Sequence, residues 1–168
     1  MPTPIRRSEP PRSDRFHLET DASVNRAIVR RAEMGGAPTF LAGGGVVLRD
    51  PAMRPIEEHS IRLGYLPSSH EAELAALLWG LKRAASLRLS RLRVRNDNAP
   101  VMHALGRALV EASFKPPTDL SGLVSIATSF ESIQFRWTKS IHVLQRGDGA
   151  HSADYLARQA CGLGKRSH

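Results

Sequence analysis

Four acidic residues occupy positions where a carboxylate is hard to explain as part of an ordinary fold. Asp21 and Asp97 each follow a stretch with the alternation of a β-strand, whereas Glu73 and Asp154 lie in otherwise apolar helical segments. An unpaired carboxylate on the core side of an element is costly. The four residues therefore predict a cluster of carboxylates that binds metal ions.

The type of metal follows from the available ligands. The chain has a single cysteine, Cys161, and no convincing pair of histidines. Carboxylate oxygens without thiolates favour a hard ion such as Mg²⁺ or Mn²⁺ over zinc. Two such ions, about 3.5–4 Å apart, activate a water and stabilise the leaving oxygen in phosphodiester hydrolysis. We therefore expect two Mg²⁺ or Mn²⁺ ions in one active site.

Composition and charge restrict the class of protein. A chain of 168 residues with 41% hydrophobic content is long enough for one domain with a buried core. The 24 Lys and Arg residues exceed the 16 Asp and Glu residues, which gives a net charge of +8. Such a surface attracts polyanions, so nucleic acid is the expected partner. The alternative is that the charge only keeps the protein soluble.

The location of the protein is predicted from what the sequence lacks. One cysteine excludes an internal disulfide framework and fits a reducing cytoplasm. No apolar run approaches the roughly 20 residues of a membrane span, and residues 1–15 contain no apolar signal segment. We expect a cytoplasmic monomer without a membrane partner.

The chain divides into a disordered basic tail at 1–15, one domain at 16–163 and a short tail at 164–168. Residues 22–42 show no sustained period and predict a long loop. Its arginines, Arg26, Arg30 and Arg31, either clamp nucleic acid through phosphate contacts or belong to a solvated loop.

Periodicity predicts five strands and four helical segments in the order β-β-β-α-β-α-α-β-α. The strands are expected at 16–21, 46–49, 56–63, 92–96 and 133–137. The helices are expected at 69–85, around 101–109, around 120–130 and at 152–163.

This order predicts an α/β fold, in which the first three strands form an antiparallel meander within a five-stranded mixed sheet flanked by helices on both faces. The first and fourth strands would be parallel neighbours. Ligands of such sheets bind at the carboxyl ends of the strands. Asp21 and Asp97 are therefore expected to lie within bridging distance of each other.

The segments around the four acids resemble the ribonuclease H family over residues 16–162, in particular its type 1-like domain associated with reverse transcriptases. The matching segments are Thr20-Asp21-Ala22-Ser23, Ala72-Glu73-Leu74, Asn96-Asp97-Asn98 and Ala153-Asp154-Tyr155. Each segment alone is a weak signal, but four in the right order on the right elements are fairly specific.

The resemblance implies a two-metal endonuclease that cuts the RNA strand of an RNA:DNA hybrid. It implies that Asp21 bridges both ions, that Glu73 and Asp97 complete one site and that Asp154 helps to hold the other. Glu73 would also lie nearest the ribose 2′-hydroxyl that distinguishes RNA from DNA. Further substrate contacts are expected from Ser23, Ser69, His70, Asn98 and Lys139.

The chain departs from the family pattern at several positions. Ala22 replaces a glycine, Ser69 and His70 replace an Asn-Asn pair that reads the minor groove, and Ala150 replaces an asparagine. His142 is the candidate for a mobile histidine that assists product release, although its spacing from Trp137 is one residue longer than usual.

Two other functions remain open at this point. The domain could be a non-catalytic module that binds hybrid or double-stranded RNA, or a nuclease for another structured nucleic acid. Outside the site, Glu19 is expected to form a cross-strand ion pair with Arg95 and to take no part in catalysis.

Overall fold

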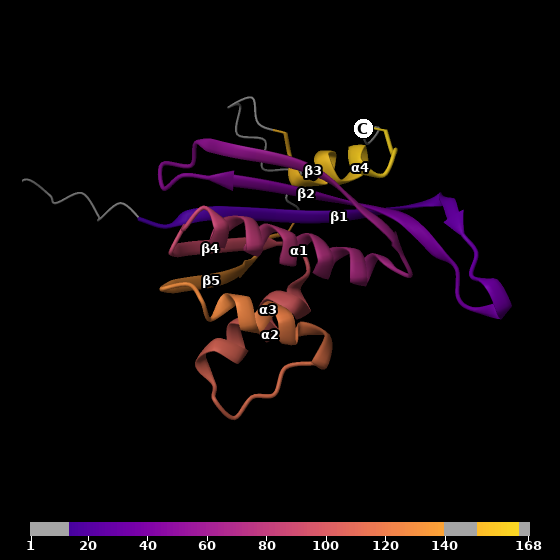
Figure 1. The fold of residues 1–168 in the computed structure, drawn as a ribbon. Coiled ribbons are helices and arrows are strands. Elements are labelled where there is room, and N and C mark those ends of the chain that lie inside the picture. Colours follow the sequence, from indigo (N-terminus) through magenta and orange to yellow (C-terminus); the bar gives the residue numbers. More distant parts are fainter. Residues whose placement is uncertain (1–13, 140–150, 165–168) are drawn as a thin grey trace, which may run out of the picture.

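The computed structural model describes residues 14–139 and 151–164, which form one five-stranded sheet with helices on both faces (Figure 1). The strand order is β3-β2-β1-β4-β5. Strands β1, β2 and β3 are antiparallel neighbours, and β4 and β5 run parallel to β1. The predicted element order, the meander and the parallel pairing of the first and fourth strands are confirmed.

The structure extends most of the predicted strands. The strands are β1 (Phe16–Arg30), β2 (Thr39–Arg49), β3 (Pro55–Leu66), β4 (Arg91–Asn96) and β5 (Ser132–Trp137). The helices are α1 (Ser69–Ser86), α2 (Ala99–Val110), α3 (Ser121–Ala127) and α4 (Ala153–Ala160). Two short 3₁₀ turns, η1 (Glu33–Gly35) and η2 (Thr118–Leu120), complete the described part of the chain.

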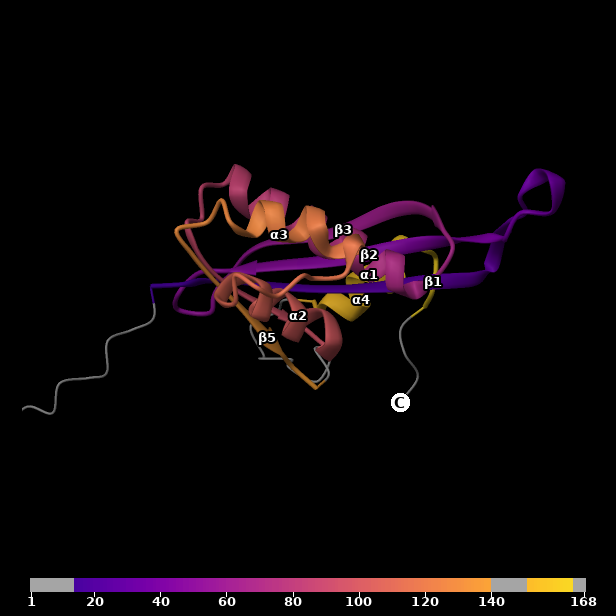
Figure 2. The same cartoon turned by 90° about the horizontal axis from the view of Figure 1, so that it is seen from below.

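The prediction of a long loop at 22–42 is wrong. Strands β1 and β2 continue as a hairpin through most of this segment, with η1 at its tip. The pairing skips from Asn25 opposite Leu41 to Val29 opposite Phe40, so residues 26–28 form a bulge. Beyond Asn25 the residues of β1 are exposed, so burial imposes no alternation on them. We call residues 26–40 the arm, because they project beyond the helices in both views (Figures 1 and 2).

One face of the sheet carries the main hydrophobic core. Helices α1, α2 and α3 pack there, and they bury one continuous cluster with the apolar residues of β1, β2 and β4 (Figure 1). Helix α1 approaches β1 closely at Gly80, where an added Cβ would lie 3.0 Å from side-chain atoms of Leu18 and Thr20. This close packing fixes the helix that carries Glu73 against the strand that carries Asp21.

Helix α4 covers the opposite face and lies on glycines of β2. A Cβ added to Gly43 would lie 2.2 Å from the carbonyl oxygen of Ala157, and one added to Gly45 would lie 1.9 Å from that of Ala153. Only glycine allows the helix backbone to approach this closely. Gly43 and Gly45 therefore form the surface on which α4 packs.

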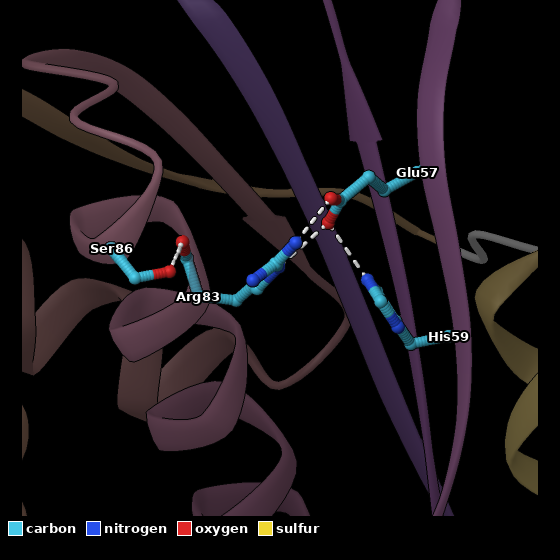
Figure 3. A network of polar contacts seen from close by, with 4 residues as sticks. All are labelled: Glu57, His59, Arg83 and Ser86. Atoms are coloured by element: carbon cyan, nitrogen blue, oxygen red, sulfur yellow. Dashed lines mark hydrogen bonds and ion pairs between the residues drawn. The ribbon is translucent and has the colours of Figure 1, made fainter.

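A polar network ties α1 to the edge strand β3 (Figure 3). The guanidinium of Arg83 donates to both carboxylate oxygens of Glu57, at 2.9 and 2.5 Å, and His59 Nε2 lies 2.8 Å from the same carboxylate. The hydrogen bond from Arg83 lowers the pKa of Glu57 to about 2. Within the described residues, no helix is long and apolar enough to cross a membrane.

Candidate active site

Asp21 lies at the point where β1 leaves its parallel neighbour. The pairing of β1 with β4 ends at Glu19, whereas the pairing with β2 continues and places Asp21 opposite Gly45. Asp21 is therefore not at the end of its strand, as the sequence suggested, but two residues beyond the last residue paired with β4. Its side chain is buried, with 6% of the residue exposed.

Three of the four predicted acids meet at this point. Oxygen atoms of Asp21, Glu73 and Asp97 all lie within 4.8 Å of one another. Glu73 comes from the second turn of α1, and Asp97 follows the last residue of β4. The predicted convergence of Asp21 and Asp97 is thus observed, with Glu73 reaching the same place from the helix.

Asp154 approaches the cluster from the other side of the sheet. It is the second residue of α4 and is buried, with 4% exposed. Its neighbour Ala153 sits directly on Gly45, which is paired with Asp21. The negative charge of Asp154 is among the causes that raise the pKa of Asp21, as expected for a nearby carboxylate.

Asn96 is a site residue that the sequence did not reveal. Its buried amide donates to the carbonyl and to the hydroxyl of Thr20, both at 3.0 Å, and to Glu73 Oε2 at 3.3 Å. Its side-chain oxygen accepts from the backbone N–H of Asn98 at 2.8 Å. One side chain therefore joins β1, β4 and the start of α2, and it orients Glu73.

The electrostatics of the cluster disfavour three free carboxylates. Burial is the main cause that raises the pKa of Glu73, followed by the negative charge of Asp21. Burial also raises the pKa of Asp21, followed by the negative charge of Asp97. A divalent cation bound between the carboxylates would reverse both effects.

The donor set fits a hard divalent cation. The converging groups are carboxylate oxygens on three separate elements, and no thiolate is near them, because the one cysteine is buried in another part of the molecule at the end of α4. Oxygen ligands of this kind suit Mg²⁺ or Mn²⁺. The residues present therefore match the ion that the sequence predicted.

The predicted substrate residues differ in their burial and in their hydrogen-bond partners. Ser23 is buried on β1, two residues beyond Asp21, and Ser69 is exposed at the first residue of α1. His70 Nε2 lies 2.8 Å from a carboxylate oxygen of Asp119. Asn98 caps α2 by accepting the backbone N–H of Val101.

The end of β5 borders the site. Trp137 is half exposed, and its indole N–H donates to the backbone carbonyl of Asp97 at 3.1 Å. Lys139 follows two residues later and is exposed. The sequence placed Trp137 on the fifth strand but did not reveal its bond to Asp97. His142, the candidate for product release, lies outside the described residues.

Glu19 takes no part in the cluster. Its backbone is in register with Arg95 of β4, and its buried carboxylate lies 3.7 Å from the guanidinium of Arg49 on β2. The ion pair of Glu19 with Arg95 stays a prediction, and the sequence did not predict the contact with Arg49.

Comparison with known proteins identifies the family. The model of the reverse transcriptase-like family matches residues 37–160, which is more than half of the chain. This span contains Glu73, Asp97 and Asp154, whereas Asp21 and most of the arm precede it. No functionally curated protein sequence matches the chain.

Solved structures with the same fold include several ribonucleases H. Ribonuclease H1 from Halobacterium salinarum is 21% identical, with a TM-score of 0.60, 87% of this chain covered and 96% of the other. The N-terminal ribonuclease H domain of a Mycobacterium tuberculosis protein is 20% identical, with a TM-score of 0.62 and coverages of 89% and 95%. A ribonuclease H1 isolated from compost by a metagenomic approach, solved in complex with an RNA/DNA hybrid, is 18% identical, with a TM-score of 0.60 and coverages of 88% and 97%.

At these identities the structures show a shared fold, with nearly the whole of each relative's chain matched. The matched family model, the order of the sheet and the carboxylates at the branch of β1 and β4 agree with one another. The chain belongs to the reverse transcriptase-like family and has the ribonuclease H-like fold.

Proposed function

We propose that this protein is a divalent-metal-dependent endonuclease that hydrolyses the RNA strand of RNA:DNA hybrids by a two-metal mechanism. The observation that carries this proposal is the convergence of Asp21, Glu73 and Asp97 within 4.8 Å in a chain with a net charge of +8. The basic chain attracts the polyanion, and the acidic cluster collects the cations that phosphodiester cleavage requires.

The four acids have distinct roles in this proposal. Asp21 would contribute to both ion sites, Glu73 and Asp97 to the first, and Asp154, from α4, to the second. When bound, the ions lower the pKa of the attacking water and stabilise the charge on the leaving oxygen.

The surrounding residues position the acids and the substrate. Asn96 holds Glu73 by a hydrogen bond and ties β4 to Thr20, so the carboxylates from β1 and α1 keep their separation without substrate. Ser69 and His70, at the start of α1, contact the minor groove one turn before Glu73, where the ribose 2′-hydroxyl is read. Lys139 binds a phosphate beyond β5.

The relatives of known structure support the choice of substrate, since the enzyme from compost was solved with an RNA/DNA hybrid. The test is cleavage of a hybrid with a labelled RNA strand, beside RNA:RNA and DNA:DNA duplexes of the same sequence, in Mg²⁺, Mn²⁺ or EDTA. We expect cutting of the hybrid's RNA strand alone, only with metal, and products with 3′-hydroxyl and 5′-phosphate ends.

Other outcomes of this assay would assign a different function. Metal-dependent cutting of another duplex would make the protein a nuclease with a different substrate. Tight, salt-sensitive binding without any cutting would make it a hybrid-binding module.

A further inference from the structure

The arm carries positive charge away from the active site. Among residues 26–40 there are three arginines, Arg26, Arg30 and Arg31, and one acid, Glu33, which gives a net charge of +2. All four residues are exposed. The arm continues β1 in the direction that leads away from Asp21 and begins five positions beyond it.

The base of the arm is fixed to the domain by Asn25. The buried amide of Asn25 donates to the carbonyl of Cys161 at 2.9 Å, and its oxygen accepts from the backbone N–H of Ala27 at 3.1 Å. The first bond ties the arm to the end of α4, and the second shapes the bulge. The direction of the arm is therefore set relative to the acids.

The arm has two faces, which point to opposite sides of the sheet. Residues opposite each other in an antiparallel pair share a face, and alternate residues along β2 point to opposite faces. Phe40 shares its face with Gly44, which contacts Ala76 of α1, whereas Thr39 shares its face with Gly43, which contacts α4. The arm thus has an α1-side face and an α4-side face.

One arginine is stacked on each face. The guanidinium carbon of Arg26 lies 5.1 Å from the centroid of the Phe40 ring, on the α1 side. That of Arg30 lies 4.2 Å from the centroid of the Tyr65 ring, and because Arg30 is opposite Thr39 this pair is on the α4 side. A stacked guanidinium is ordered, and its N–H groups along the edge remain available for a phosphate.

The α1-side face of the arm leads towards the start of α1. Phe40 is paired with Leu66, the last residue of β3, and Ser69 begins α1 three residues later. From there Glu73 lies one turn into the helix. Arg26 and Phe40 are therefore connected through the end of β3 to the first turn of α1, which precedes Glu73.

We propose that the α1-side face of the arm binds the phosphodiester backbone of the nucleic acid outside the cleavage site, with Arg26 as the residue that contacts phosphate. This inference rests on the proposed function for the identity of the duplex. Five residues of strand separate Arg26 from Asp21, which is about 17 Å. At about 3.4 Å per base pair, the contact falls about five base pairs from the cut.

The test compares Arg26→Gln with Arg30→Gln, which remove the same charge from opposite faces of the same arm. Binding of a labelled hybrid is measured by fluorescence anisotropy as a function of salt, with Ca²⁺ as the divalent ion. We expect Arg26→Gln to weaken binding about fivefold at low salt and to reduce the slope of log K against log salt by about 1. Arg30→Gln should change binding less than about twofold, as expected for a cation that faces away from the duplex.

A length series sharpens this test. Hybrids are shortened from either end, and the effect of Arg26→Gln should disappear once fewer than about five base pairs remain on one side of the cut. Equal effects of the two substitutions, or no effect of Arg26→Gln on the longest hybrid, would overturn the proposal.

The exposed apolar residues Ile28, Val29 and Met34 provide a further control. Their joint replacement by serine should leave hybrid binding unchanged. If the serine variant loses hybrid binding and Arg26→Gln does not, the arm contacts its partner through apolar side chains instead of through Arg26. Cleavage by the wild type is measured separately. If the wild type cuts the hybrid but binding does not depend on Arg26, only the proposed role of the arm is refuted. If binding depends on Arg26 but no cutting occurs, only the proposed nuclease activity is refuted.

Discussion

The two faces of the central sheet differ in what holds them to their helices. Fourteen described residues form the buried apolar cluster on the face of α1, α2 and α3, whereas the cluster beneath α4 contains three, Val47, Ala153 and Leu156. The α4 face instead buries polar side chains along β1, among them Glu19, Asp21 and Asn25. The main apolar core therefore lies on the α1 face, whereas the candidate site draws on both sides of the sheet, with Glu73 on α1 and Asp154 on α4.

Strand β1 is the boundary between the two faces. Leu18 and Thr20 point towards α1, and the alternate residues Glu19 and Asp21 point towards α4. The free-energy cost of burying the Asp21 carboxylate can therefore be offset, because Asp21 is held by a strand whose opposite side packs in the main core.

The largest effect on stability is expected on the α1 face. Leu81→Ala removes a fully buried side chain from the main cluster and should lower the free energy of unfolding by about 3–5 kcal/mol. Urea unfolding measures this loss. Leu156→Ala, on the packed side of α4, should lower the free energy of unfolding by about 2 kcal/mol. A loss equal to or larger than that of Leu81→Ala would show that the α1 face does not contribute more to stability than the α4 face.

Gly45→Ala should separate stability from activity. The new methyl group would collide with the backbone of Ala153, so α4 must shift and carry Asp154 away from Asp21. We expect a loss of about 1–3 kcal/mol and at least a tenfold fall in hybrid cleavage, as for a displaced catalytic group.

Gly106→Ala is the matched control for this change, because nothing lies within 4 Å of its added Cβ in α2. That variant should keep cleavage and raise the free energy of unfolding by about 0.5–1 kcal/mol, because alanine favours a helix interior. Full activity in Gly45→Ala would show that the close packing of α4 on Gly45 does not position Asp154.

Glu73→Gln should stabilise the metal-free protein while it removes activity. Burial and Asp21 raise the pKa of Glu73 from 4.5 to about 9, so ionisation costs stability increasingly as the pH rises through this range. The neutral amide avoids this cost, and Tm at pH 8 in EDTA should rise by about 2–6 °C.

The gain should vanish at pH 4, where Glu73 is protonated in both states. Glu131→Gln, an exposed acid remote from the cluster, should change Tm little at either pH. A gain in Glu73→Gln of the same size at pH 4 and pH 8 would show that its cause is not the charge.

The smallest effect is expected for the network of Arg83 and Glu57 on the edge of the α1 face (Figure 3). Arg83 lowers the pKa of Glu57 to about 2, so this stabilisation is present above pH 4.5 and is lost as the pH falls towards 2. Arg83→Ala should lower Tm by about 1–3 °C at pH 7 and have no effect near pH 2. Lys82→Ala, an exposed neighbour, is the control, and a loss in Arg83→Ala that persists at pH 2 would point to packing.

The sequence predicted the element order, the antiparallel meander and the parallel pairing of the first and fourth strands, because these depend on local patterns. Alternation in 16–21 and 92–96 and the apolar period of α1 were enough to place Asp21, Asp97 and Glu73 near one another. The arm was missed because β1 beyond Glu19 has one paired edge, and beyond Asn25 its side chains are exposed around a bulge. These residues therefore show no alternation from which a strand could be predicted.

Two features of the site depend on contacts between elements and could not be read from one segment. Asn96 was counted only as part of a strand, since its role comes from Thr20 and Glu73, which are distant in sequence. The approach of Asp154 depends on the fit of α4 onto Gly43 and Gly45. A run of glycines before a strand does not by itself indicate which helix will pack on it.

The central claim is that the cluster of Asp21, Glu73 and Asp97 is a catalytic metal site, and Asp97→Asn tests it most directly. This substitution keeps the size of an exposed side chain, so the fold should be retained while one ligand charge is lost. The measurement is Mg²⁺-dependent cleavage of a labelled RNA:DNA hybrid by the wild type, Asp97→Asn and the control Glu131→Gln. We expect full activity in the control and a loss of at least a hundredfold in Asp97→Asn, the order of effect of losing a principal source of transition-state charge stabilisation. Undiminished cleavage by Asp97→Asn would contradict the claim.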